Sequence, residues 1–146
     1  MDRSERVVSL SGKDLLEVKS IILLDGSINK PEIARRGWSI FDIDDKAIFD
    51  EDAINLAKSF RSQGAFCFFV SPIFSILNAE DRCDAFRFKS TREEVEFFQG
   101  AEWHSINLDD CLLFDLPMNC AVRRPGTVDT TSFMGNSLFI KQISRG

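Results

Sequence analysis

Two aspartates at the end of an apolar segment are the sharpest chemical feature of this sequence. Asp42 and Asp44 lie two positions apart in the segment IFDIDD, residues 40–45. Residues two apart in a strand point to the same side. At the end of a strand the two carboxylates can therefore face one site. A carboxylate pair of this kind can hold a divalent cation, or it can supply a nucleophile and a general acid.

This segment resembles the first motif of the haloacid dehalogenase-type phosphatases. In that family the first Asp is the nucleophile, the second is the general acid, and both surround a magnesium ion. The resemblance gives these roles to Asp42 and Asp44, and it implies a magnesium-dependent phosphatase as the alternative function. Further residues match the phosphoryl-holding Ser or Thr, the lysine and the later acidic pair of the family, and these are Ser71, Lys89, Asp109 and Asp110.

Other arrangements for catalysis are missing from the sequence. His104 is the single histidine, and no nucleophile-elbow or Gly-rich phosphate-loop motif is present. After Asp44 the chain continues with Asp45-Lys46, where the phosphatase family has Gly-Thr or Asp-Thr. The leading interpretation therefore assigns no catalytic residue, no metal and no cofactor to this chain.

Acidic residues are concentrated in the middle of the chain. The net charge is −5, and residues 93–115 contain seven acidic residues and no lysine or arginine. A second acidic run occupies residues 42–52. A negative surface repels nucleic acid and anionic membranes and attracts basic proteins. The charge pattern predicts either a basic protein partner or a solvated acidic face.

We interpret the chain as an intracellular protein-binding protein of the inhibitor or immunity type. It would occupy the positively charged active face of a basic partner, such as a nuclease toxin, with long-range attraction speeding the encounter. A small structural or assembly subunit is a third possibility, and the oligomeric state is open. The expected contact residues are acidic residues of the two runs together with both tryptophans: Asp44, Asp45, Glu93, Glu94, Asp109, Asp110, Trp38 and Trp103.

The composition predicts one globular domain spanning residues 1–146. Hydrophobic residues make up 44% of the chain, and 14 Phe stand beside 2 Trp and no Tyr. Because phenylalanine carries no polar group, we expect most of these rings in the core. No export signal or membrane-length apolar segment is seen, so we expect a cytoplasmic protein. The four cysteines form no Cys-x-x-Cys pair and are predicted to be reduced, partly buried thiols, with one disulfide as the alternative.

The hydrophobic pattern predicts an α+β or α/β fold, with a single mixed β-sheet and two to three helices. Residues 38–43 and the wholly apolar segment 65–70 are predicted strands. Between them, residues 50–64 place their apolar side chains on one helical face, with Asp50 as the N-cap and Gly64 at the end. This order indicates an N-terminal βαβ-like unit with a parallel strand pair.

The rest of the chain is predicted to form shorter elements. A short helix and a strand at residues 21–24 are expected near the N-terminus, or one helix over 13–24. A strand with one wet face covers residues 85–89, and Thr91 to Glu94 has the form of a capping box. The remainder predicts a C-terminal antiparallel meander, with strands at residues 105–108, 112–116, 120–124 and 137–143.

Overall fold

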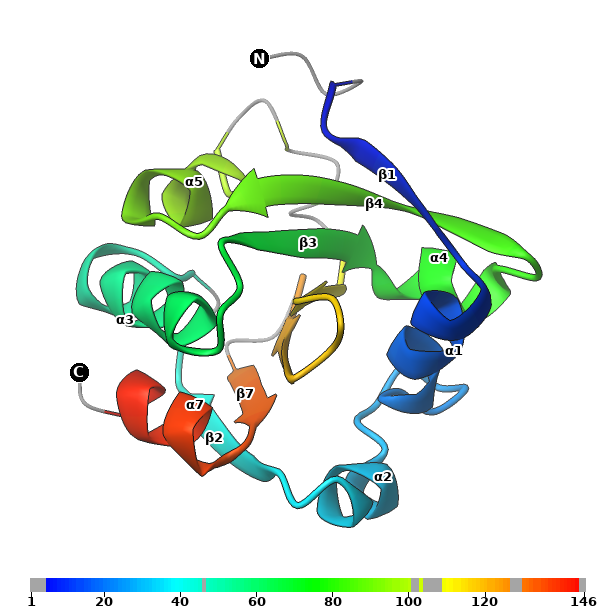
Figure 1. The fold of residues 1–146 in the computed structure, drawn as a ribbon, viewed down its shortest axis with the longest axis horizontal. Coiled ribbons are helices and arrows are strands. Elements are labelled where there is room, and N and C mark those ends of the chain that lie inside the picture. Colours follow the sequence, from blue (N-terminus) through cyan, green and yellow to red (C-terminus); the bar gives the residue numbers. More distant parts are fainter. Residues whose placement is uncertain (1–4, 46, 101–102, 104–108, 127–129, 145–146) are drawn as a thin grey trace.

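A single antiparallel sheet forms the centre of the protein (Figure 1). The computed structural model describes residues 5–45, 47–100, 103, 109–126 and 130–144. The strand order is β1-β4-β3-β5-β6-β7-β2, and every neighbouring pair is antiparallel. The chain is therefore a mixed α+β single domain. Its strands are β1 (Val7–Ser11), β2 (Ser39–Ile43), β3 (Cys67–Pro72), β4 (Arg82–Lys89), β5 (Cys111–Phe114), β6 (Cys120–Arg124) and β7 (Thr131–Gly135).

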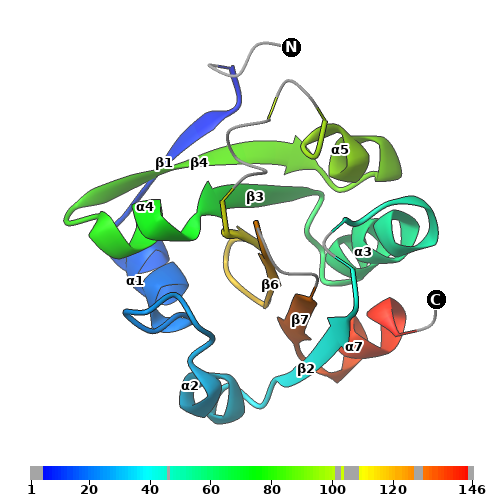
Figure 2. The same cartoon turned by 180° about the vertical axis from the view of Figure 1, so that it is seen from behind.

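Helices cover the sheet from two sides. In both views α3, α5 and α7 lie on one side of the molecule, and α1, α2 and α4 lie on the other (Figures 1 and 2). Within the described ranges there are six helices, more than the two or three predicted, and none has the length and apolar character to cross a bilayer. They are α1 (Gly12–Ser20), α2 (Lys30–Arg35), α3 (Asp50–Ser62), α4 (Ile73–Asn78), α5 (Arg92–Phe97) and α7 (Ser137–Ile143).

An aromatic core fills the space between the sheet and the helices α3, α5 and α7. We use this name for five fully buried rings that stack or meet edge to edge: Phe60, Phe68, Phe88, Phe98 and Trp103. The centroids of Phe60 and Phe68 are 5.2 Å apart, and those of Phe68 and Phe88 are 5.6 Å apart. These distances are typical of favourable ring pairs. The prediction that phenylalanine serves mainly the core is confirmed for these rings.

A second, mostly aliphatic core lies on the opposite face of the sheet, under α1, α2 and α4. Leu15 and Val18 reach it from α1, and Ile76 reaches it from α4. The interior strand β3 serves both cores, because Phe68 points into the first and Phe69 packs against the second. Burial on both faces explains why this strand is wholly apolar in sequence.

The strand–helix–strand unit predicted for the first half of the chain is present as β2, α3 and β3. Because all neighbouring strands are antiparallel, β2 and β3 run in the same direction, but β5, β6 and β7 lie between them. The predicted parallel pair is therefore wrong. An apolar pattern indicates that a strand is buried, but it does not indicate which strands lie next to it in the sheet. The predicted antiparallel meander is confirmed in β5, β6 and β7.

Helix α3 begins differently from the prediction. Phe49 is its N-cap, and Asp50 is the first helical residue, with a positive φ of 52° and no capping hydrogen bond. The predicted capping role of Asp50 is therefore wrong. The three acids of the first turn still complement the positive end of the helix dipole. The helix ends before Gly64, whose φ of 83° lies in the left-handed region, as predicted.

The C-terminal segment 137–143, predicted as a strand, is helix α7. Its N-cap Asn136 accepts a hydrogen bond from the backbone N–H of Phe139 at 3.0 Å. Phe139 and Ile143, four residues apart, are both buried on the same helical face. The capping residue and this spacing outweigh the apparent alternation, and the last strand of the meander is β7, which was not predicted.

Residues 21–24 do not form the predicted strand. Helix α1 ends at Ser20, and Ile22 makes only an isolated bridge to Ile28 across a turn. Ile21 and Ile22 are nevertheless buried, whereas Leu23 and Leu24 are exposed, so the apolar pattern indicated burial correctly only for the first half of the segment. Strand β1, the partner of β4, was not predicted. The predicted strand at 105–108 lies outside the described residues.

The aromatic core predicts a sharp contrast between two phenylalanines near the start of β3. Phe68 is fully buried, whereas Phe66 is 73% exposed. Phe68→Ala removes a ring that touches three others, and we expect it to lower the free energy of unfolding by about 3–5 kcal/mol. Phe66→Ala should change it by less than about 0.5 kcal/mol. Urea unfolding of both variants is the measurement, and similar costs for the two would contradict this account of the core.

Candidate functional site

An acidic patch forms where the first turn of α3 meets α5. We define it as six carboxylates contributed by two separate parts of the chain: Asp45, Asp50, Glu51, Asp52, Glu93 and Glu96. Four of them are exposed, and the side chains of Asp52 and Glu96 are half-buried. The closest link between the two parts is a hydrogen bond from the backbone N–H of Asp50 to Oε2 of Glu96, at 2.7 Å.

The side chain of Gln99 holds the two parts of the acidic patch together through hydrogen bonds. Gln99 follows α5, and its side-chain oxygen accepts a hydrogen bond from the backbone N–H of Ile48 at 2.8 Å. Its side-chain amide donates to the carbonyl of Ile48, also at 2.8 Å, and to that of Val95. Arg124 donates to the same glutamine oxygen at 3.1 Å. The segment leading into α3 is thereby held against the end of α5.

One arginine lies among the six carboxylates. Arg92 pairs with Asp50 at 3.0 Å and with Glu96 at 3.3 Å. No other lysine or arginine of the described residues forms an ion pair with the patch. The remaining carboxylates therefore project a negative field that this single cation does not balance.

The surroundings of the patch shift the pKa values of two of its carboxyl groups. The pKa of Asp52 is raised, first by partial burial and then by the charges of Asp45 and Glu51. The pKa of Glu96 is lowered, chiefly by the hydrogen bond from the backbone of Asp50 and further by Arg92. The pKa of Asp52 therefore reflects its burial first and the neighbouring like charges second.

Glu94, one of the predicted contact residues, has a structural role instead. It forms a two-pronged ion pair with the buried Arg6, at 2.7 and 3.0 Å, and it accepts a bond from the backbone N–H of Lys89. Partial burial raises its pKa, but the bonds from Arg6 and Lys89 outweigh that effect and bring it below its ordinary value. This pair ties the segment before β1 to α5.

The acids of residues 109–115 do not join the patch. Asp110 pairs with Arg123 at 3.1 Å and accepts a bond from the backbone N–H of Gly126. Asp109 lines a pocket beside α4, a helix that both views place on the other side of the molecule from α3 and α5. Asp115 is 1% exposed and accepts bonds from the backbone of Asn119 and Cys120. The two acidic runs of the sequence therefore converge only in part.

The two tryptophans predicted as contacts lie elsewhere. Trp103 is 1% exposed and meets Phe86 and Phe88 edge to edge, each at 5.1 Å, so it belongs to the core and not to a contact surface. Trp38 is half-buried against the second core, with the guanidinium of Arg36 at 5.1 Å from its ring. Of the eight predicted residues, Asp45 and Glu93 lie in the patch, and the exposed Asp44 adjoins it in sequence.

The residues grouped by the phosphatase resemblance are separated in the fold. Asp42 and Asp44 are exposed at the edge strand β2. Ser71 is buried in β3, four strand spacings away, which is roughly 19 Å across the sheet. Within the described ranges no three acidic, Cys or His side chains are grouped to hold a metal, and His104 lies outside those ranges. The residues that the phosphatase resemblance groups are therefore not brought together within the described ranges.

The four cysteines are free thiols, and three of them are buried. Burial raises the pKa of Cys111 to about 11 and holds that of Cys120 well above its ordinary value. A thiol of this kind is protonated at neutral pH and is a poor nucleophile. Cys67 is the half-buried exception.

Comparisons of the chain with protein-family models, with curated proteins and with solved structures found no match.

Asp115 provides a test of buried charge. Burial raises its pKa, partly offset by the bonds from Asn119 and Cys120. The folded protein therefore binds a proton at a higher pH than the unfolded chain does. As the pH falls through the folded pKa toward 3.8, this residue should add stability that is absent at neutral pH.

Asp115→Asn keeps the accepting oxygen without the buried charge, so we expect it to have a higher free energy of unfolding than wild type at neutral pH. This difference should disappear as the pH falls through this window, because Asp115 itself then becomes neutral. Asp115→Ala leaves two backbone donors unpaired and should cost about 1–3 kcal/mol at pH 7. Urea unfolding between pH 4 and 7 is the measurement, with the exposed Asp81→Asn as control for charge alone. A difference between wild type and Asp115→Asn that is constant with pH would refute this assignment.

The different burial of the four cysteines predicts that one thiol reacts faster than the other three with a maleimide. In the native protein at pH 8, a maleimide should react first with Cys67, because the other three thiols are buried. Cys67→Ser should abolish the fast phase, and all four thiols of wild type should react in denaturant. Mass spectrometry of the labelled protein gives the count, and a fast phase that persists in Cys67→Ser would show that a buried thiol opens.

Proposed function

We propose that this chain is an acidic protein-binding domain of the inhibitor or immunity type, which covers the positively charged face of a basic protein such as a nuclease. The observation that carries the proposal is the grouping of six carboxylates from two parts of the chain, two of which pair with Arg92. A basic partner gains from such a surface at a distance, because the field acts before contact.

The patch is also supported rigidly. Gln99 holds the segment before α3, and the Arg6–Glu94 pair holds α5. A preformed charged surface loses little conformational entropy when a partner binds. Exposed Phe49, 43% accessible and directly before the patch in sequence, supplies an apolar side chain of the kind that anchors a contact once charge has guided the approach.

The test compares two variants that remove the same number and kind of charges. Asp44→Asn/Asp45→Asn/Glu93→Gln neutralises exposed acids in and beside the patch. Asp14→Asn/Glu80→Gln/Asp81→Asn neutralises exposed acids on α1 and before β4. The probe is a labelled deca-arginine peptide, and its association rate constant is measured by stopped flow at low and at physiological salt.

We expect the patch variant to associate at least about tenfold more slowly than wild type at low salt, and the control variant by less than about threefold. The wild-type rate should fall by about tenfold or more at physiological salt. Inhibition of a basic ribonuclease should follow the same ranking. Equal losses in the two variants would mean that net charge acts without a patch, and a rate insensitive to salt would refute electrostatic recognition.

A further inference from the structure

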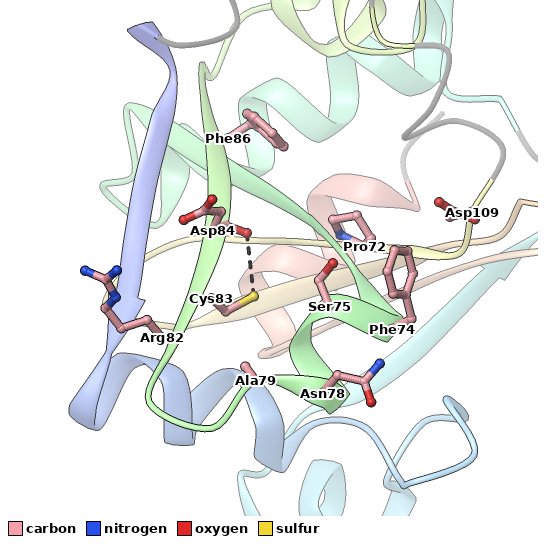
Figure 3. A pocket seen from close by; sticks show the side chains of 10 residues that line it. All are labelled: Pro72, Phe74, Ser75, Asn78, Ala79, Arg82, Cys83, Asp84, Phe86 and Asp109. Carbon is pink, nitrogen blue, oxygen red and sulfur yellow. Dashed lines mark hydrogen bonds between the residues drawn. The ribbon is translucent and has the colours of Figure 1, made fainter.

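A pocket of about 680 Å³ lies between α4 and the first half of β4 (Figure 3). Phe74 and Ser75 enter its lining from α4, Asp84 and Phe86 from β4, and Asp109 from the segment before β5. The volume lies within the range of small-molecule sites in proteins. None of these residues belongs to the acidic patch, so the argument for the pocket does not depend on the proposed function.

Two phenylalanines give the pocket an apolar wall. Phe74 is 55% exposed although it lies in a hollow of the surface. Phe86 is half-buried, because its ring also packs edge to edge against Trp103. The faces of aromatic rings attract organic cations and bury the apolar part of a ligand.

Two carboxylates give the pocket its charge. Asp84 is exposed and Asp109 is half-exposed, and neither forms an ion pair among the described residues. The neighbouring Asp110, by contrast, is paired with Arg123. The backbone of Asp84 is fixed, since its carbonyl accepts a bond from the hydroxyl of Ser71 at 2.9 Å.

Arg82 is the one basic residue named in the lining. In Figure 3 its guanidinium extends away from Phe74 and Asp109. It forms no ion pair with Asp84 or Asp109 in the described part of the chain. The two carboxylates are therefore available to a ligand from outside.

We infer that this pocket binds a small organic cation with an apolar body, namely an alkyl- or aryl-substituted guanidinium or ammonium. The cationic group pairs with the carboxylate of Asp109, and the apolar body packs on the ring of Phe74, which lies beside Asp109 in Figure 3. The hydroxyl of Ser75 supplies a further acceptor at the wall. A ligand with these two parts satisfies both the charge and the exposed aromatic surface of the pocket.

The experiment is a titration of the ¹⁵N-labelled full chain, followed by NMR, with three probes of similar shape. Phenylguanidine carries the cation, phenylurea is its neutral counterpart, and benzoate carries the opposite charge. We expect phenylguanidine to shift the amide signals of residues 72–86 and of Asp109. Phenylurea should bind at least about tenfold more weakly, and benzoate should not bind there.

Matched variants identify the groups responsible. Asp109→Asn and Phe74→Ala should each weaken phenylguanidine binding about fivefold or more. Asp81→Asn and Phe66→Ala remove an exposed acid and an exposed ring outside the lining, and they should leave binding unchanged. Thermal melts establish that each variant is folded.

Three results would overturn the inference. Phenylurea could bind as tightly as phenylguanidine, the two control variants could weaken binding as much as the lining variants, or the shifts could fall on Glu51 and Glu93 instead of the pocket. A pocket that responds to deca-arginine but not to free phenylguanidine would also overturn it, because the site would then be part of a protein-binding surface. The proposed function is unaffected by any of the first three.

Discussion

The stacking of phenylalanine rings between the sheet and the helices α3 and α5 is the constraint on which the rest of the structure depends. Phe60 comes from α3, Phe68 from β3, Phe88 from β4 and Phe98 from the end of α5. These rings bring four distant parts of the chain to one place. Because close-packed interiors tolerate little displacement, the two helices have one position relative to each other. The acidic patch above them follows from that position.

The fold decides which charged side chains of this protein have an oppositely charged partner. Arg6 neutralises Glu94, Arg36 lies between Glu17 and Glu32, and Arg123 neutralises Asp110. These pairs connect elements and leave little field outside the molecule. Among the described residues, the acids at the start of α3 form ion pairs only with Arg92, and so the negative field is directed outward from there. The net charge of −5 is thus distributed unevenly, and the start of α3 is a strongly acidic region of the described surface.

The patch and the pocket present negative charge in different ways. Most carboxylates of the patch are exposed, and they act together over distances comparable to the screening length of salt. The pocket joins two carboxylates to aromatic surface within a hollow, where contact and desolvation govern recognition. The first arrangement suits the approach of a large basic partner, and the second suits a small cation. Both follow from the side chains that the sheet and its helices leave without partners.

The sequence by itself determined several of the local elements. Spacing at three and four residues gave α3, the wholly apolar segment gave β3, and Thr91 with Glu94 gave the start of α5. It could not determine which strands are neighbours, because hydrogen bonding between strands carries no sequence mark, and the predicted parallel pair failed for that reason. Nor could it show that Glu94 pairs with an arginine 88 positions away or that Trp103 is buried. Long-range packing decides whether an acidic side chain faces solvent, an ion-pair partner or the interior. Only the tertiary structure contains that packing.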